Sequence, residues 1–340
     1  MGRGGVAKAR EVLQTFVLYG PRVRGEMLVS SDMALALDAL RRNLASVIKG
    51  KTEAIELLLT GVLAGGHVLL EDVPGSGKTT LAKALARSLS LPFSRVQFTP
   101  DLLPADIVGS TVLRPADGSF AFQPGPIFTS VLLADEINRA SPRTQSALLE
   151  AMNEAQVTVD GRTHRLPEPF LVIATQNPVD FQGTYPLPEA QLDRFLVRFA
   201  LGYPPLEAEL GVLMAHRGAS PLESLAPVAS GDDLRAMQEQ VRAIEVREPV
   251  ARYLLRLVDA SRHHPDIELG VSTRGALAYF RAAQASALLA GRSYVSPDDL
   301  QRLADPVLSH RLTLAPQARY GGRSPRAVIT ELLERTAVPT

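Results

Sequence analysis

Two short polar motifs follow apolar segments of this sequence, and their residue types suit the chemistry of phosphate groups. The first motif is a glycine-rich loop that contains Gly75 and Gly77 and ends in Lys78 and Thr79. Glycines let backbone N–H groups turn inward around phosphate oxygens, and the lysine reaches the outer phosphates. A threonine hydroxyl in the next position suits Mg²⁺. The loop therefore predicts a site for the phosphates of a nucleotide.

The segments on either side of this loop are those that a phosphate-binding loop requires. Residues 67–70 are mostly apolar and indicate a buried strand. After the loop, five apolar side chains share one helical face: Leu81, Ala82, Leu85, Ala86 and Leu89. A strand, a glycine loop and a helix N-terminus form a favourable anion site, whereas a glycine-rich loop alone is compatible with an ordinary turn.

Asp72 departs from the general pattern of such loops. The pattern G-x-x-x-x-G-K-[ST] has glycine at this position. A carboxylate beside phosphates is repelled by them. This repulsion would be eased if the Asp72 side chain points away from the concave face of the loop, and we expect nucleotide binding to survive the departure.

The second motif is a pair of acids, Asp135 and Glu136, at the end of the apolar run that starts at Ser130. Ligands of open α/β sheets bind at the carboxyl ends of the strands. In that place Asp135 suits the hydration shell of Mg²⁺, and Glu136 suits the activation of a water that attacks the γ-phosphate.

Three further polar residues have both a functional and a structural interpretation. Asn177 follows the apolar run 169–175 and could hydrogen-bond an attacking water, but it also fits an ordinary turn before proline. Arg194 ends a short predicted helix as a solvated charge or as an arginine finger that reaches a neighbouring subunit. Arg274 lies near the start of a predicted helix, as a structural residue or as a cationic arm over the nucleotide.

Composition limits the classes of function. The chain has 340 residues, 36 acidic and 36 basic side chains and no cysteine. A balanced charge gives no general attraction to nucleic acid or to an anionic membrane. The lack of cysteine excludes disulfides and thiolate metal sites, and the longest apolar stretch, 54–70, is too interrupted for a membrane span.

The pattern along the chain predicts two structured parts. Residues 1–30 are predicted to be a poorly ordered extension without a secretory signal, 31–203 an α/β nucleotide-binding domain, and 204–230 a connecting helix and linker. Residues 231–340 are predicted to form an all-helical domain, in which Ser296 caps one helix. Two hairpins are predicted, around Asp117-Gly118 and Asp160-Gly161.

Taken together, these motifs resemble the AAA+ ATPases, and within them the MoxR family. The resemblance runs from about Asp32 to the end of the chain. Five strings carry it: 71–79 (EDVPGSGKT), 134–140 (ADEINRA), 174–178 (ATQNP), 185–195 (YPLPEAQLDRF) and 272–275 (STRG). The second and fourth are the most specific.

This resemblance implies an α/β fold, in which a P-loop AAA+ core with a five-stranded parallel sheet is followed by an all-helical lid. It implies ATP and Mg²⁺ as cofactors, bound between the core and the lid, with Thr79 and Asp135 at the metal. The catalytic residues that it implies are Glu136 (Walker B), Asn177 (sensor 1), Arg194 (arginine finger) and Arg274 (sensor 2). The ATP contacts that it implies are Pro74, Gly75, Ser76, Gly77, Lys78, Thr79 and Thr80.

The resemblance also implies a hexameric ring in the cytoplasm that remodels or activates partner proteins, often ones with von Willebrand factor A domains. Three alternatives stay open at this point. They are a helicase-like nucleic-acid motor, the ATPase subunit of a metal chelatase, and a nucleotide-bound scaffold that does not hydrolyse ATP. The missing basic stripe counts against the first, and Glu136 and Arg194 count against the last.

Overall fold

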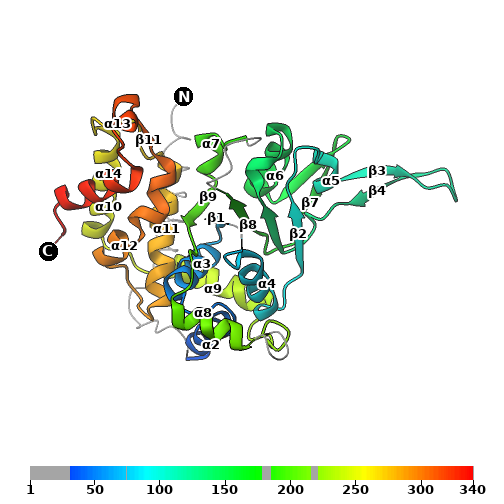
Figure 1. The fold of residues 1–340 in the computed structure, drawn as a ribbon, viewed down its shortest axis with the longest axis horizontal. Helices are drawn as coiled ribbons and strands as arrows, with labels where there is room; N and C mark the ends of the chain where they lie inside the picture. The colour runs from blue at the N-terminus through cyan, green and yellow to red at the C-terminus, as the bar shows by residue number, and fades with distance from the viewer. Residues whose placement is uncertain (1–30, 74, 178–184, 216–220, 340) are drawn as a thin grey trace, which may run out of the picture.

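The computed structural model of the chain describes residues 31–73, 75–177, 185–215 and 221–339 (Figure 1). The predicted N-terminal extension and Pro74 therefore lie outside the described residues. A sheet occupies the centre, and most of the C-terminal helices pack together at one side of it (Figure 1).

The central sheet has five parallel strands, as predicted. In spatial order they are β2 (Phe93–Gln97), β5 (Val131–Asp135), β8 (Leu171–Gln176), β1 (His67–Glu71) and β9 (Phe195–Phe199). The inner strands are buried on both faces, which explains their nearly continuous apolar sequences.

Helices cover both faces of this sheet. Val68 and Leu70 of β1 belong to one hydrophobic cluster with α2 (Ser31–Val47), α3 (Thr52–Leu63) and α4 (Lys78–Ser88). Leu69 points to the other face, in a second cluster with α6 (Pro142–Glu154). The alternation along β1 thus fixes where its polar end, and the loop that follows, must lie.

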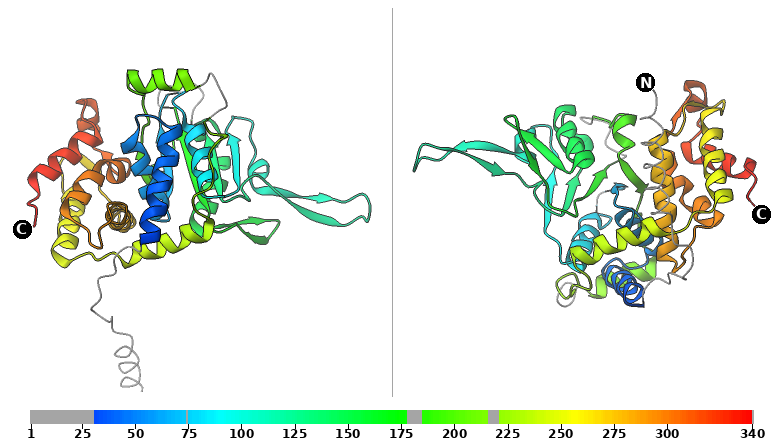
Figure 2. Two further views of the ribbon diagram at one scale, coloured as in Figure 1. Left: turned by 90° about the horizontal axis from the view of Figure 1, so that it is seen from below. Right: turned by 180° about the vertical axis from the view of Figure 1, so that it is seen from behind.

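Both predicted hairpins are present. The first pairs β3 (Gly109–Leu113) with β4 (Phe120–Pro124) after the short helix α5 (Pro104–Val108). It projects well beyond the body of the molecule (Figure 2). The second pairs β6 (Gln156–Val159) with β7 (Arg162–Arg165).

The C-terminal part is helical apart from one small sheet. Its helices are α8 (Leu206–Ala215), α9 (Gly231–Ala243), α10 (Glu248–Arg262), α11 (Thr273–Leu289), α12 (Pro297–Leu308), α13 (Pro316–Tyr320) and α14 (Pro325–Arg335). Ser296 directly precedes α12, and its amide donates to the Asp299 carboxylate. The antiparallel pair β10 (Ile267–Leu269) and β11 (Thr313–Leu314) was not predicted, because such short strands leave no periodic pattern.

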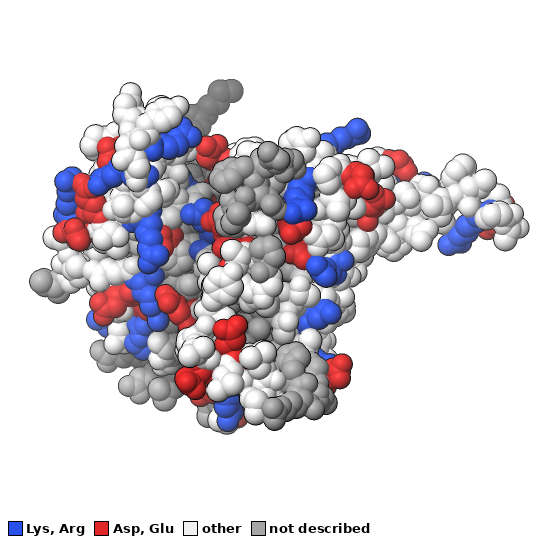
Figure 3. All heavy atoms as spheres, viewed as in Figure 1, with Lys and Arg blue, Asp and Glu red and all other residues white. Residues whose placement is uncertain are grey.

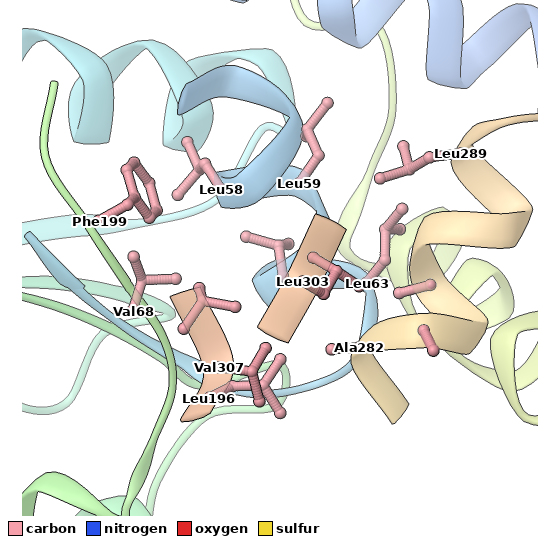
Figure 4. Close-up of a cluster of buried hydrophobic side chains, with 14 of the residues drawn as sticks. Leu58, Leu59, Leu63, Val68, Leu196, Phe199, Ala282, Leu289, Leu303 and Val307 are labelled. Carbon is pink, nitrogen blue, oxygen red and sulfur yellow. The ribbon is translucent and has the colours of Figure 1, made fainter. Parts of the chain in front are cut away.

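The helical part and the sheet share one hydrophobic cluster (Figure 4). Leu63 of α3 packs among Ala282 and Leu289 of α11 and Leu303 of α12. The division of the chain into domains remains a prediction, but this cluster joins the two parts. No helix among the described ranges is long and apolar enough to cross a membrane.

His67, the first residue of β1, is a buried and neutral imidazole. Its Nδ1 accepts a hydrogen bond from the Val172 amide, so its Nε2 carries the proton and donates to the Met152 carbonyl, 2.9 Å away. Burial lowers the pKa of His67 from 6.5 to about 4.

This shift predicts an acid-dependent loss of stability. Below pH 6.5 the unfolded chain binds a proton at His67, whereas the folded chain resists until about pH 4. The stability that the neutral His67 contributes is thus complete above pH 6.5 and is lost as the pH falls toward 4. Replacing His67 with glutamine should reduce the stability loss between about pH 7 and pH 4.5 by about 2–3 kcal/mol. Urea unfolding of both proteins at both pH values measures the free energy of unfolding. The same pH dependence in wild type and His67→Gln would contradict the prediction.

Candidate active site

The glycine-rich loop lies between the end of β1 at Glu71 and the start of α4 at Lys78. Gly75 and Gly77 have φ angles of +82° and +94°, in the left-handed region that other residues rarely adopt. A Cβ at Gly75 would meet nothing within 4 Å, so backbone conformation rather than crowding requires glycine there. The loop has the conformational freedom that the sequence predicted.

Polar groups of the loop fit a phosphate ligand. The Ser76 hydroxyl is buried and has no hydrogen-bond partner within the described part of the chain. The Lys78 ammonium lies across the loop and donates to the carbonyls of Asp72, at 2.8 Å, and Val73, at 3.0 Å. Thr79 and Thr80 follow in the first turn of α4, where the helix dipole favours an anion.

The Asp72 side chain is directed toward the residues after β9, the orientation that would ease repulsion from phosphates. Its carboxylate accepts hydrogen bonds from the Val73 amide and from the amides of Leu201 and Gly202, each at 2.8 Å. These last two residues lie just beyond β9, after Ala200. The side chain therefore connects the loop with the outer strand of the sheet.

Asp135 is held firmly at the end of β5. Its Oδ1 accepts from the Thr175 hydroxyl at 2.6 Å, and its Oδ2 accepts from the Arg95 guanidinium at 2.5 Å. The side chain of Asp135 is 11% exposed, so the Arg95 charge compensates a mostly buried carboxylate. A carboxylate in this place, with the hydroxyl of Thr79, offers the oxygen ligands that Mg²⁺ prefers.

Glu136 has an unusual backbone. Its φ and ψ are 56° and 49°, and its amide donates to the Thr175 hydroxyl at 2.8 Å. Its carboxylate accepts from the Gln97 amide at 2.7 Å and pairs with Arg139 at 3.1 Å. Thr175 thus holds both acids at once, through the side chain of one and the backbone of the other.

The sheet order brings four of the predicted residues to one edge. Lys78 follows β1, Asn177 follows β8, and Asp135 and Glu136 end β5, with β8 between the other two strands. Parallel strands end at the same edge, and neighbouring strands are about 4.8 Å apart. Asn177 is buried to 7% exposure and its carbonyl accepts from Asn138. These side chains can therefore act on one ligand.

Arg194 and Arg274 lie at the opposite edge. Arg194 immediately precedes β9, whose first residue pairs with His67 at the beginning of β1. The loop lies at the other end of β1, about 16 Å away along a five-residue strand. The hydroxyl of Ser272, at the start of α11, donates to Asp193 at 3.1 Å, which places Arg274 near Arg194. Neither arginine is close to its own chain's glycine loop.

The two arginines influence one another. Burial lowers the pKa of the Arg194 guanidinium, and the charge of Arg274 lowers it further, whereas Glu150 raises it. The Nε of Arg194 is buried without a partner in the described part of the chain, and Arg274 is exposed. Two neighbouring cations of this kind suit an anion that arrives from outside the subunit.

A buried ion pair that the sequence did not predict supports this arginine pair. Arg311, which is 5% exposed, donates to Asp193 at 2.8 Å and also to the carbonyl of Phe195. Burial lowers the pKa of Arg311 to about 10, although Asp193 opposes the shift. Arg311 thereby joins the helical part to Asp193, the residue directly before Arg194.

A hollow of about 450 Å³ opens beside the glycine loop. Gly75, Ser76 and Gly77 line it together with apolar side chains, namely Val47, Ile48, Val212, Leu213 and Leu222. Polar and charged residues also line it, among them Ser46, Lys49, Lys51, Thr80 and Glu209. The walls come from the end of α2, from α8 and from residues near α8. None of its lining residues comes from α9–α14. That ATP binds between the core and the helical lid stays a prediction.

Comparison with known proteins agrees with this geometry. Residues 67–197 match the ATPase family associated with various cellular activities, and residues 259–332 match the AAA lid domain. Chaperone MoxR1 of Mycobacterium tuberculosis is 42% identical over 86% of this chain and 80% of its own length. Protein MoxR of Paracoccus denitrificans is 34% identical over 80% of this chain and 87% of its own.

The chain belongs to the MoxR family of AAA+ ATPases. Another relative, the uncharacterised protein YeaC of Bacillus subtilis, is 47% identical over 92% of this chain and 98% of its own length. A crystal structure from Cytophaga hutchinsonii, of a protein assigned provisionally as an ATPase, superposes with a TM-score of 0.85. It has 35% identity and covers 99% of this chain and 100% of its own.

Two residues around this MoxR-family site, Arg95 and Thr175, were not predicted from the sequence. Arg95 lies in β2, far from the motifs, and only the pairing of β2 with β5 brings it to Asp135. Thr175 precedes the predicted Gln-Asn turn and looked like the last residue of a strand. A polar residue at the end of a buried strand was the signal that could have identified it.

Thr175 offers a test of this arrangement. Replacing Thr175 with valine removes the hydroxyl that orients Asp135 and the Glu136 amide, with almost no change in side-chain volume. We expect the rate of ATP hydrolysis to fall roughly 10- to 100-fold, the range for partners that orient metal ligands, with little change in nucleotide affinity. Steady-state hydrolysis and equilibrium binding measure the two quantities. Thr175→Ser keeps the hydroxyl and should stay close to wild type; equal losses in both variants would contradict this role.

Proposed function

We propose that the protein hydrolyses ATP with Mg²⁺ and uses the energy to remodel or activate partner proteins. The observation that carries this proposal is the set of Lys78, Asp135, Glu136 and Asn177 at one sheet edge, with two arginines at the other. Family membership and the name of chaperone MoxR1 support the same function.

Each side chain has a role that its position suits. The glycine loop and Lys78 bind the phosphates, while Thr79 and Asp135 would hold Mg²⁺, which would supply positive charge to neutralise the phosphates. Glu136 orients a water and accepts its proton, and Asn177 hydrogen-bonds the water or the γ-phosphate. Thr175 keeps both acids in place.

Arg194 and Arg274 act on the nucleotide of a neighbouring subunit. Their distance from the glycine loop of their own chain supports this role, because a cation at that edge of the sheet is far from the phosphates of its own subunit. Sites shared in this way require an oligomer, and we propose the hexameric ring that the family resemblance implies. Assembly takes place in the cytoplasm, where ATP is abundant.

The β3–β4 hairpin is the part that we assign to contact with the client protein. Leu113 and Phe120, paired across the hairpin, are 55% and 74% exposed. An isolated two-stranded hairpin with exposed apolar side chains is only marginally stable in water, so burial against a protein surface favours it. A von Willebrand factor A domain is the partner class that the resemblance implies.

A nucleic-acid motor receives less support. Lys and Arg are interspersed with Asp and Glu on the face shown in Figure 3, without a continuous basic track. Strand-tracking proteins need a positive groove for the phosphates of the backbone. The projecting hairpin carries one basic residue in its strands and turn, Arg114.

The role of Glu136 predicts a separation of binding from hydrolysis. Glu136→Gln keeps the side-chain shape but cannot accept a proton. The rate should fall about 100-fold or more, as for a general base, while ATP still binds. The matched control is Glu239→Gln, an exposed carboxyl on α9, which should hydrolyse ATP like the wild type. Hydrolysis by Glu136→Gln at the wild-type rate would reject the assignment.

Sharing of the site between subunits can be tested by mixing two inactive variants. Lys78→Ala has no working phosphate loop but an intact Arg194, whereas Arg194→Ala has the reverse. If Arg194 acts on a neighbour, mixed oligomers contain some complete sites, and the mixture hydrolyses ATP although neither variant does alone. Each variant mixed with wild type serves as a control for subunit exchange. A mixture that stays inactive despite exchange would show that Arg194 does not act between subunits.

A further inference from the structure

Asp72 is the most highly connected residue of the loop region. Its side chain is 5% exposed, and both carboxylate oxygens accept backbone N–H groups. Oδ1 accepts from Val73, while Oδ2 accepts from both Leu201 and Gly202. A carboxylate that accepts several backbone donors forms strong, charge-assisted hydrogen bonds.

The backbone of Asp72 makes different contacts from its side chain. Its amide donates to the Gln176 carbonyl at 3.1 Å, and its carbonyl accepts from Lys78 at 2.8 Å. A glycine at this position would keep both of these backbone contacts. Only the carboxylate joins the loop to residues 201 and 202.

Residues 201–205 lead directly into α8, and they are stiff. Gly202 has a φ of +62°, and the Tyr203 carbonyl accepts from Lys51 at 2.5 Å. Pro204 and Pro205 follow, with φ angles fixed by their rings. A Cβ added to Gly50 would lie 2.8 Å from the Cβ of Ala208, so α8 also packs closely on the turn after α2. A displacement at residues 201 and 202 is therefore passed on to α8.

Helix α8 forms one wall of the hollow beside the loop. Val212 and Leu213 of this helix line it, as do Ile48 and the glycines of the loop. The glycine loop suits phosphates, and the apolar side chains of Ile48, Val212 and Leu213 suit a flat base. The wall made by α8 therefore affects the base of a nucleotide and not its phosphates.

We propose that Asp72 is a positioning residue that fixes this base-binding wall through residues 201–205. This proposal rests on the proposed function, since it assumes that ATP binds in the hollow. It has an unexpected consequence: Asp72→Gly, which restores the general loop pattern, weakens ATP binding.

The experiment compares ATP with inorganic tripolyphosphate, which has the phosphates but no base. Isothermal titration with Mg²⁺ measures the affinity of each for the full chain. In Asp72→Gly we expect ATP to bind about tenfold more weakly or worse, the change for one lost charge-assisted hydrogen bond, while tripolyphosphate keeps its affinity within about twofold. Asp72→Asn keeps one acceptor oxygen and should fall between. Asp38→Asn, a 63% exposed carboxyl on α2, is the control and should match the wild type.

Each outcome separates this inference from the proposed function. Wild type that binds neither ligand rejects the proposed function itself. Wild type that binds both, with Asp72→Gly unchanged for ATP, rejects the inference alone. Equal losses for ATP and tripolyphosphate show that Asp72 supports the phosphate loop and overturn the positioning role. If Asp72→Gly does not fold, Asp72→Asn decides between the outcomes. Weaker binding of ATP with unchanged binding of tripolyphosphate supports the proposal, and unchanged binding of ATP overturns it.

Discussion

The common direction of the five strands is the constraint on which the site depends. Because β1, β8 and β5 all run the same way, their carboxyl ends place Lys78, Asn177, Asp135 and Glu136 at one edge. The same constraint puts the amino end of β9, and with it Arg194, at the other edge. A single chain thus has Lys78 and the two acids at one side of the sheet and a cationic pair at the opposite side. Such polarity is what head-to-tail association of subunits requires.

Two side chains, Thr175 and Asp193, hold the polar residues in place at the ends of the strands. Thr175 orients Asp135 and the Glu136 backbone with one hydroxyl, and Asp193 accepts from Arg311 and Ser272 beside Arg194. Both devices are buried or half-buried, where hydrogen bonds to charged groups are strong and a missing partner is costly. The geometry of the edges therefore depends on residues that need not touch a ligand.

Much of this arrangement follows from the sequence because its signals are local. An apolar run followed by a polar motif fixes both a strand and the edge at which the motif lies, which is why Lys78 and Asp135 could be placed in advance. Hairpins with Asp-Gly turns are equally local. Arg95 and Arg311 could not be predicted, since each reaches its carboxylate only through the order of strands or the packing of α12 against β9. The wall of the hollow was also missed, because an apolar residue such as Val212 looks the same in a core and in a pocket.

Asp72 shows how a departure from a motif can carry information. A general loop pattern describes only what phosphates need, and glycine satisfies that need at position 72. A carboxylate there has a second role, because it accepts hydrogen bonds from two backbone N–H groups just beyond β9. Since those groups lie where the chain leaves the sheet for α8, the substitution links the strand that starts the loop to the helix that closes the hollow. The carboxylate of Asp72 then holds the wall that we assign to the base, whereas the backbone contacts of Asp72 with Gln176 and Lys78 do not depend on that carboxylate.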